Sequence, residues 1–157
     1  MKKLKILNWF LIILIALSIV GMIGNIIHFH SLGFSSEMLY QTKSNFGNSK
    51  FWLFFISHIV FFLGLFFMQQ AVYKVYKSKK FTIQSKHYFN YSAVLLIISA
   101  FCHTCLYLID KDFYDKDFLI QSLSFYFLEI ILALVLFAVN DIVKLGINFQ
   151  TENELTI

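Results

Sequence analysis

The chain has 157 residues, 59% of them hydrophobic, and a net charge of +4. Soluble domains are about 45–50% apolar, so this composition and a mean hydropathy of +0.71 exclude a water-soluble globule and indicate an integral membrane protein. A positive charge is also typical of nucleic-acid-binding proteins, but the distribution of the lysines favours a different partner, the lipid bilayer.

Four stretches are long and apolar enough to cross a bilayer, which takes about 20 residues of α-helix. We predict transmembrane helices at residues 6–29, 51–72, 89–109 and 118–139. The first is too long for the apolar core of a signal peptide and no small-residue cleavage site follows it, so we expect it to be retained. No span contains Pro, and the loops are short. The sequence therefore predicts an all-α fold, a single membrane domain (residues 1–157) that forms an antiparallel four-helix bundle with a tail at 141–157.

The lysines are distributed unevenly between the two ends of this bundle. Nine of the 13 lie in the N-terminal tail, the second loop and the C-terminal tail, and four lie in the first and third loops. Because cytoplasmic segments carry an excess of basic residues, both termini are predicted to be inside, in the cytoplasmic membrane. The basic stretch at residues 73–80 is then a topology signal that contacts anionic lipid headgroups, and no direct nucleic-acid binding is expected.

Small and polar residues recur at spacings of three and four in the predicted spans. Such stripes are how helices pack against one another in lipid, where hydrophobicity gives no driving force for association. We therefore expect each stripe to face the interior of the bundle. In the first span the stripe consists of Ser18, Gly21, Asn25 and His28.

Three ionisable residues fall well inside the predicted spans. At a rise of 1.5 Å per residue, His58 lies about 10 Å from the outer end of its helix, His103 about 9 Å, and Glu129 about 15 Å. An ionisable group at such a depth is a candidate functional residue, and we expect Glu129 to be either protonated or paired with a histidine. We predict an intramembrane polar site of Glu129, His58, His103 and Asn25. Two interpretations stay open: a proton relay or ligand-polarising acid, and a hydrogen bond between helices that fixes their packing.

The sequence FCHTC at residues 101–105 holds the only two cysteines, with a histidine between them. Reactive C-x-x-C pairs favour a helix N-terminus, whereas Cys102 and Cys105 lie near the C-terminal end of their predicted helix. The c-type haem motif requires the histidine after the second cysteine, and a structural zinc site requires four ligands. We expect these cysteines to pack, and we predict no metal, no cofactor and no catalytic residue. A haem between His58 and His103, or thiol chemistry, is the less favoured alternative.

Two stretches, KSKKFTIQSKHYFNYSAVLL and the final NDIVKLGINFQTENELTI, carry a further pattern. Its elements are Phe81-Thr82, Lys144-x-Gly146 and Glu154-Leu155-Thr156-Ile157. In these features and in layout, the chain resembles the bacterial four-helix membrane family known as domain of unknown function 2975 (DUF2975), although Lys80 stands where Pro is frequent and Glu154 where Asp is common. The resemblance implies both termini inside and, as a partner, a very small helix-turn-helix regulator encoded nearby. It implies no catalytic residues.

The end of the chain carries a second signal. Thr151-x-x-Glu154 matches the capping box that begins a helix, but the sequence stops three residues later, so we expect little helix there. We expect the tail to dock, either on its own bundle beside Phe81 or on a partner through the C-terminal carboxylate. The predicted partner contact consists of Phe81, Thr82, Glu154, Leu155, Thr156 and Ile157.

These observations favour a membrane protein without enzymatic activity that senses or binds, and whose cytoplasmic loop and tail contact a partner. The alternative is a small transport or proton-relay unit that uses Glu129 with His58 and His103. A thiol or haem redox protein is the third and least favoured class. A homo-oligomer is compatible with a bundle of this size.

Overall fold

The computed structural model of the chain describes residues 2–31, 46–109 and 116–155. These residues form four helices: α1 (Lys2–Ser31), α3 (Phe46–Ser78), α4 (Ile83–Ile109) and α5 (Lys116–Leu155). Each is long and apolar enough to cross a membrane. The prediction of an all-α fold with four candidate transmembrane helices is therefore confirmed, and the fold is compatible with a multi-pass membrane protein.

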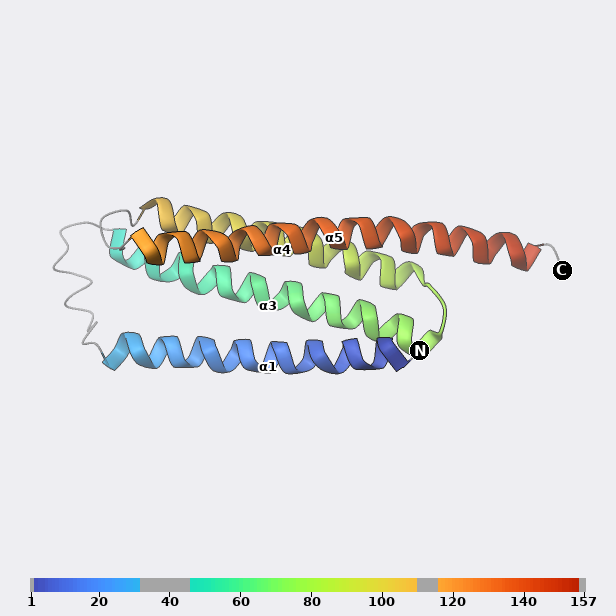
Figure 1. Ribbon diagram of the computed structural model, residues 1–157, viewed down its shortest axis with the longest axis horizontal. Helices are drawn as coiled ribbons and strands as arrows, with labels where there is room; N and C mark the ends of the chain where they lie inside the picture. The colour runs from blue at the N-terminus through green and yellow to red at the C-terminus, as the bar shows by residue number, and fades with distance from the viewer. Residues whose placement is uncertain (1, 32–45, 110–115, 156–157) are drawn as a thin grey trace.

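The helices alternate in direction and pack in chain order (Figure 1). α3 lies between α1 and α4, and α4 also packs on α5; within the described residues, α1 contacts α3 and no other helix. The start of α1, the α3–α4 turn and the end of α5 therefore lie at one end of the molecule. We call it the lysine-rich end, because the nine lysines within residues 2–5, 74–86 and 144 lie there.

α1 is held on α3 by polar and apolar contacts close to the lysine-rich end. Gln69 Nε2 donates to Asn8 Oδ1 at 3.0 Å, and Gln70 Nε2 donates to Gln69 Oε1 at 2.9 Å. Asn8 and Leu11 are buried. The packing predicted for the stripe of the first span is wrong at Gly21, because no atom of the described residues lies within 4 Å of a Cβ built there. The side chain of Asn25 falls outside the described residues.

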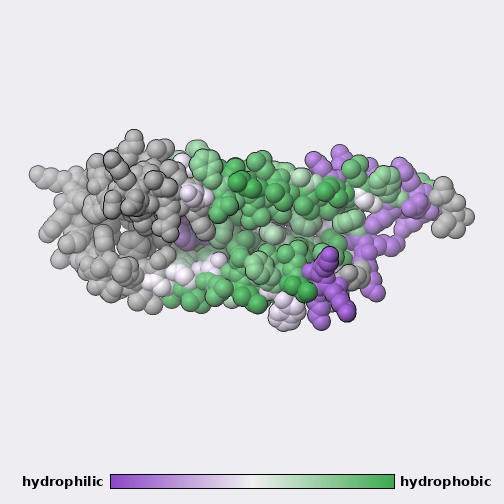
Figure 2. All heavy atoms as spheres, in the orientation of Figure 1, coloured by the Kyte–Doolittle hydropathy of each residue, from purple (hydrophilic) through white to green (hydrophobic). Residues whose placement is uncertain are grey.

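The core lies between α3, α4 and α5 and depends on small residues. A Cβ added to Gly64 of α3 would lie 3.1 Å from Cδ2 of Leu96 in α4, and Ser92 Oγ donates to the carbonyl oxygen of Gly64 at 2.7 Å. Such close approach is how helices associate in lipid. Many large apolar side chains face outward, and Figure 2 shows a hydrophobic middle and a hydrophilic lysine-rich end. The buried apolar cluster consists of Leu11, Ala71, Val72, Val75, Phe89, Ala93, Leu96, Ala133, Leu136 and Val143.

α5 is much longer than the span predicted for it. Its 40 residues make a helix about 60 Å long, about twice the thickness of the hydrocarbon core. The predicted tail is therefore helical as far as Leu155. Thr151 lies within this helix and its Oγ1 donates to the carbonyl oxygen of Asn148 at 2.7 Å, so the capping box predicted at Thr151 and Glu154 is wrong. Thr156 and Ile157 lie outside the described residues.

A capping box occurs instead at the start of α4. The N–H of Thr82 donates to Ser85 Oγ, and the N–H of Ser85 donates to Thr82 Oγ1, both at 3.1 Å. This reciprocal pair satisfies two of the N–H groups that the first turn of a helix leaves without partners. Before it, α3 ends at Ser78, and Lys79 adopts a φ of 56°, in the left-handed region that favours glycine.

Replacing Lys79 by Gly is expected to stabilise the protein by about 0.5–1 kcal/mol, because glycine adopts a positive φ without the steric cost of a Cβ. The matched control is Lys77→Gly in the last turn of α3, which is expected to lose about 1 kcal/mol of helix propensity. Thermal unfolding of the detergent-solubilised protein measures both changes. Equal destabilisation by the two substitutions would contradict the left-handed geometry at residue 79.

Candidate functional site

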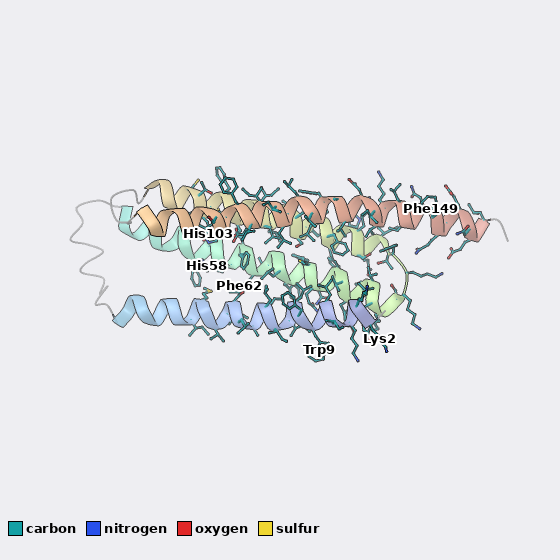
Figure 3. The ribbon with its side chains drawn as sticks, in the orientation of Figure 1. Lys2, Trp9, His58, Phe62, His103 and Phe149 are labelled. Atoms are coloured by element: carbon teal, nitrogen blue, oxygen red, sulfur yellow. The ribbon has the colours of Figure 1, made fainter. Side chains whose placement is uncertain are left out.

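Three helices contribute polar residues to an interior site far from the lysine-rich end. His58 lies on α3, His103 on α4, and Tyr126 and Glu129 on α5. The ring of His58 meets His103 edge-on and the ring of Tyr126 stacks parallel on His103, with both pairs of centroids 5.1 Å apart. Figure 3 shows the two histidines close together on neighbouring helices. We call these four residues the histidine–glutamate site.

Glu129 is the member of this site whose polar atoms are least satisfied. Its side chain is 4% exposed, and its Oε2 lies 3.7 Å from His103 Nδ1, within reach of an ion pair but beyond a hydrogen bond. Neither carboxylate oxygen has a hydrogen-bond partner among the described residues. A buried polar group without partners costs free energy. Glu129 is therefore placed to take up a proton or to bind a group that donates hydrogen bonds.

His103 links this carboxyl group to the backbone of α3. Its Nδ1 lies 3.4 Å from Ser99 Oγ, one turn earlier on α4, and Ser99 Oγ donates to the carbonyl oxygen of Ser57 at 3.3 Å. Both serines are fully buried. Since the one hydroxyl proton of Ser99 is donated to Ser57, Ser99 Oγ is an acceptor for a His103 tautomer that carries its proton on Nδ1. A doubly protonated ring donates from both nitrogens and attracts an ionised Glu129.

The structure brings together three of the four residues predicted for the polar site, His58, His103 and Glu129. The fourth, Asn25, falls outside the described side chains. Tyr126 is a further member that the predicted set does not contain. Its position three residues before Glu129 puts both side chains on one face of α5, which is the signal that identifies it.

The two cysteines lie one turn apart near the C-terminal end of α4, and both are free thiols of intermediate exposure. Among the described residues, no three His, Cys, Asp or Glu side chains are grouped closely enough to hold a metal ion. The direct edge-to-face contact of His58 with His103 leaves no space for a porphyrin between the two rings.

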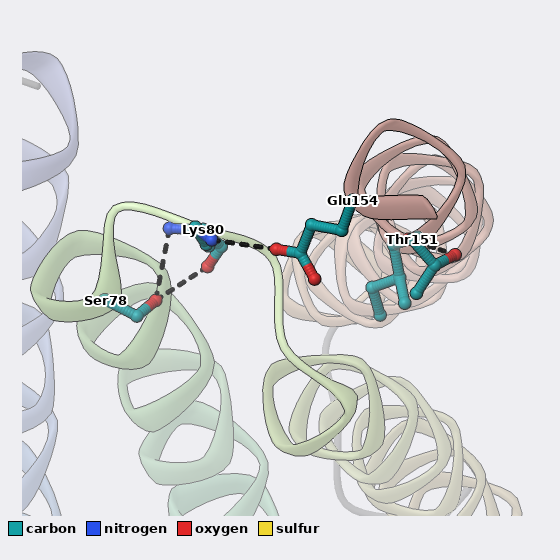
Figure 4. Close-up of polar contacts among 5 residues, drawn as sticks. Ser78, Lys80, Thr151 and Glu154 are labelled. Atoms are coloured by element: carbon teal, nitrogen blue, oxygen red, sulfur yellow. Dashed lines mark hydrogen bonds and ion pairs between the residues drawn. The ribbon is translucent and has the colours of Figure 1, made fainter. Parts of the chain in front are cut away.

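A second group of polar contacts joins the end of α5 to the α3–α4 turn (Figure 4). Lys80 Nζ lies 3.0 Å from Glu154 Oε1, and both side chains are about two-thirds exposed. Ser78 Oγ lies 2.6 Å from the carbonyl oxygen of Lys80 and 2.8 Å from that of Lys74, which closes the end of α3. The predicted docking of the tail on its own bundle is thus present at Glu154. Leu155 is 86% exposed, so the predicted docking does not extend to its side chain.

Phe81 is the anchor of this junction. A Cβ added to Gly146 would lie 2.8 Å from Cε2 of the Phe81 ring and still closer to Cδ2, so only glycine allows the ring to lie against α5. In the amide orientation that satisfies both groups, Gln150 donates to the carbonyl oxygen of Phe81 at 3.1 Å and accepts from its N–H at 3.3 Å. The chain before α4 is therefore attached to α5 through both its ring and its backbone.

Comparison with known proteins gives no relative: no protein-family model, no curated protein and no solved structure matches the chain. The resemblance to DUF2975 therefore remains a prediction. The two separate stretches that carry it meet in the structure, because Phe81 of one lies against Gly146 of the other.

Proposed function

We propose that this chain is a multi-pass sensor of the cytoplasmic membrane. It takes up a proton or a hydrogen-bonding ligand at the histidine–glutamate site and passes this state to a partner at its lysine-rich end. The observation that carries the proposal is the continuity of α5, which holds Glu129 in the interior and Gly146, Gln150 and Glu154 at the α3–α4 turn. One rigid element therefore connects a titratable site with a surface.

The orientation of the protein is part of this proposal. Nine of the 13 lysines lie at the end where α1 begins and α5 ends. Because the basic end of a membrane protein is usually cytoplasmic, we place both termini inside the cell. The histidine–glutamate site then lies in the outer half of the membrane.

The packing between the two ends favours sensing over conduction. From Glu129 to Asn140, which lies at the lysine-rich end, the distance along α5 is about 16 Å. The buried side chains of that interval on α5, Ala133 and Leu136, are apolar and cluster with Ala93 and Leu96 of α4. The buried hydroxyl of Ser92 lies on α4 at this level, but its proton is donated to the carbonyl oxygen of Gly64, so a proton that reaches Glu129 meets mainly apolar side chains. A signal crosses this region more readily as a movement of helices than as a movement of ions.

The histidine–glutamate site supplies a physical cause for such a movement. When Glu129 is ionised and His103 is protonated, their attraction in low-dielectric surroundings draws α5 towards α4. When either group loses its charge, this attraction is lost, while the apolar contacts remain. Uptake or release of one proton, or binding of a cation, therefore changes the relative stability of two arrangements of α4 and α5.

The partner surface is the junction between the α3–α4 turn and the end of α5. It presents the half-buried pair Phe81 and Thr82, the exposed Lys80–Glu154 ion pair and the exposed Leu155. An apolar residue beside paired charges is suited to a protein partner. The partner implied by the family resemblance is the small helix-turn-helix regulator encoded nearby.

Removal of residues 151–157 is expected to reduce recovery of that regulator with the membrane protein at least tenfold, because Glu154 and Leu155 are lost while the Gln150–Phe81 attachment remains. Co-purification from membranes of cells that express both proteins measures the effect. Lys77→Gln, at the same end but outside the junction, is the matched control and is expected to leave recovery unchanged. Full recovery with the truncated chain would refute the role of this surface.

A further inference from the structure

An open polar pocket of about 320 Å³ lies between α4 and α5 at the lysine-rich end. It is separate from the histidine–glutamate site and plays no part in the proposed sensing. Every residue of its lining is polar, and the lining consists of Lys86, His87, Asn90, Asn140, Asp141 and Lys144. The first three lie near the start of α4, which begins at Ile83; of these, Lys86 falls within the first turn, where the positive end of the helix dipole acts.

The pocket is flanked by exposed apolar side chains. On α4, Ile83 precedes it and Tyr91 and Val94 follow it, and on α5 Ile142 and Leu145 are exposed beside it. Tyr91 stacks on His87 with ring centroids 6.2 Å apart, an arrangement typical of aromatic residues at the membrane–water interface. A basic end beside exposed apolar side chains is where a membrane protein meets lipid headgroups.

The charges of the lining call for a ligand with two chemically different ends. Lys86 and Lys144, from opposite helices, offer N–H donors to an anion, as lysines do for phosphate. Asp141 repels a second negative charge and accepts from a cation. Asn140 Oδ1 is buried and has no hydrogen-bond partner among the described residues, so it requires an N–H or O–H donor.

We propose that this pocket binds the phosphoethanolamine headgroup of a membrane phospholipid, with the phosphodiester between Lys86 and Lys144 and the ammonium group at Asp141 and Asn140. A primary ammonium group supplies N–H donors to both oxygen acceptors. A choline headgroup carries the same charge without any N–H group and leaves Asn140 unsatisfied. Inorganic phosphate satisfies the lysines but offers nothing to the carboxylate of Asp141.

The test is the affinity of the purified, detergent-solubilised full chain for single lipids, measured by native mass spectrometry. Phosphatidylethanolamine is expected to bind at least tenfold more tightly than phosphatidylcholine of the same acyl chains. The double substitution Lys86→Gln and Lys144→Gln is expected to weaken binding of both lipids at least tenfold. Asp141→Asn, at an exposed position, is expected to remove the preference between them while phosphate-dependent binding is retained.

Lys77→Gln at the same end of the molecule, outside the pocket, is the matched control and is expected to change neither affinity. Equal binding of the two lipids by the wild-type chain would overturn the proposal, and so would unchanged binding by the double variant. Complete displacement of phosphatidylethanolamine by millimolar inorganic phosphate would also overturn it, since the site would then belong to a free anion. None of these results depends on the regulator, so this proposal and the sensing proposal fail independently.

Discussion

Replacement of Glu129 by Met is expected to stabilise the folded protein by about 1–3 kcal/mol, because it removes a buried carboxyl group whose oxygens lack hydrogen-bond partners among the described residues. The volume of the side chain is nearly conserved, so the packing of Ala133 and Leu136 on the same helix is retained. The substitution is also expected to make recovery of the regulator independent of external pH. Thermal unfolding in detergent and co-purification measure the two effects.

This substitution separates the two interpretations that the sequence leaves open. If Glu129 only fixed the packing of the helices, Glu129→Met would lower the unfolding temperature. If Glu129 is a functional group that costs the protein stability, the Glu129→Met variant unfolds at a higher temperature and its recovery of the regulator does not change with pH. Glu129→Gln, which keeps the shape and one acceptor oxygen, is the control for packing. If proteoliposomes with the wild-type chain take up protons and the Glu129→Gln substitution abolishes this uptake, the transport alternative replaces the sensing proposal.

Gly146→Ala is expected to destabilise the junction by about 1–3 kcal/mol, the usual effect of adding a methyl group where no space exists. The new Cβ would meet the ring of Phe81, and the ring is not free to retreat because Gln150 holds the backbone of Phe81 through two hydrogen bonds. We therefore expect the end of α5 to detach from the α3–α4 turn in this variant. Faster hydrogen exchange of the backbone N–H groups of residues 147–155 would report it.

The chain offers a matched control for this prediction in Gly24→Ala. Among the described residues, no atom lies within 4 Å of a Cβ at Gly24, so the substitution is expected to gain up to about 1 kcal/mol of helix propensity. Combining Gly146→Ala with Phe81→Ala is expected to restore exchange rates close to those of Phe81→Ala alone, since the clash disappears with the ring. A Gly146→Ala protein as stable as the Gly24→Ala protein would contradict the contact.

The positions of the helices could be predicted from sequence because each apolar run is close to the length that a bilayer requires. The end of α5 could not. Asn148, Gln150 and Glu152 interrupt the apolar pattern, yet the chain contains no proline and the helix continues to Leu155. The matching motif Thr151-x-x-Glu154 was misleading because a capping box also requires a non-helical residue at its start, which the pattern of letters does not encode.

The residues of the candidate site could be predicted from sequence only through their depth along each helix. His58 and His103 have similar depths by counting residues and meet in the structure, and Glu129, counted about 5 Å deeper, also reaches His103. The parallel stacking of Tyr126 on His103 depends on the rotation of α5, which helical spacing alone does not determine. The attachment of Phe81 to Gly146 and Gln150 joins segments about 65 residues apart, and no local pattern predicts such a contact.

Because α5 is one unbroken helix, a small tilt near Glu129 produces a larger displacement at its C-terminal end. Glu129 and Glu154 are 25 residues apart, so about 38 Å of helix separates them. A tilt of about 5° around Glu129 moves the far end by about 3 Å at that length, as far as the 3.0 Å that separates Lys80 Nζ from Glu154 Oε1. Ala133 and Leu136 lie close to Glu129 and move by less than about 1 Å in such a tilt, so their packing is kept while the surface contact opens. A proline or an unsupported glycine between Glu129 and Glu154 would uncouple the two ends.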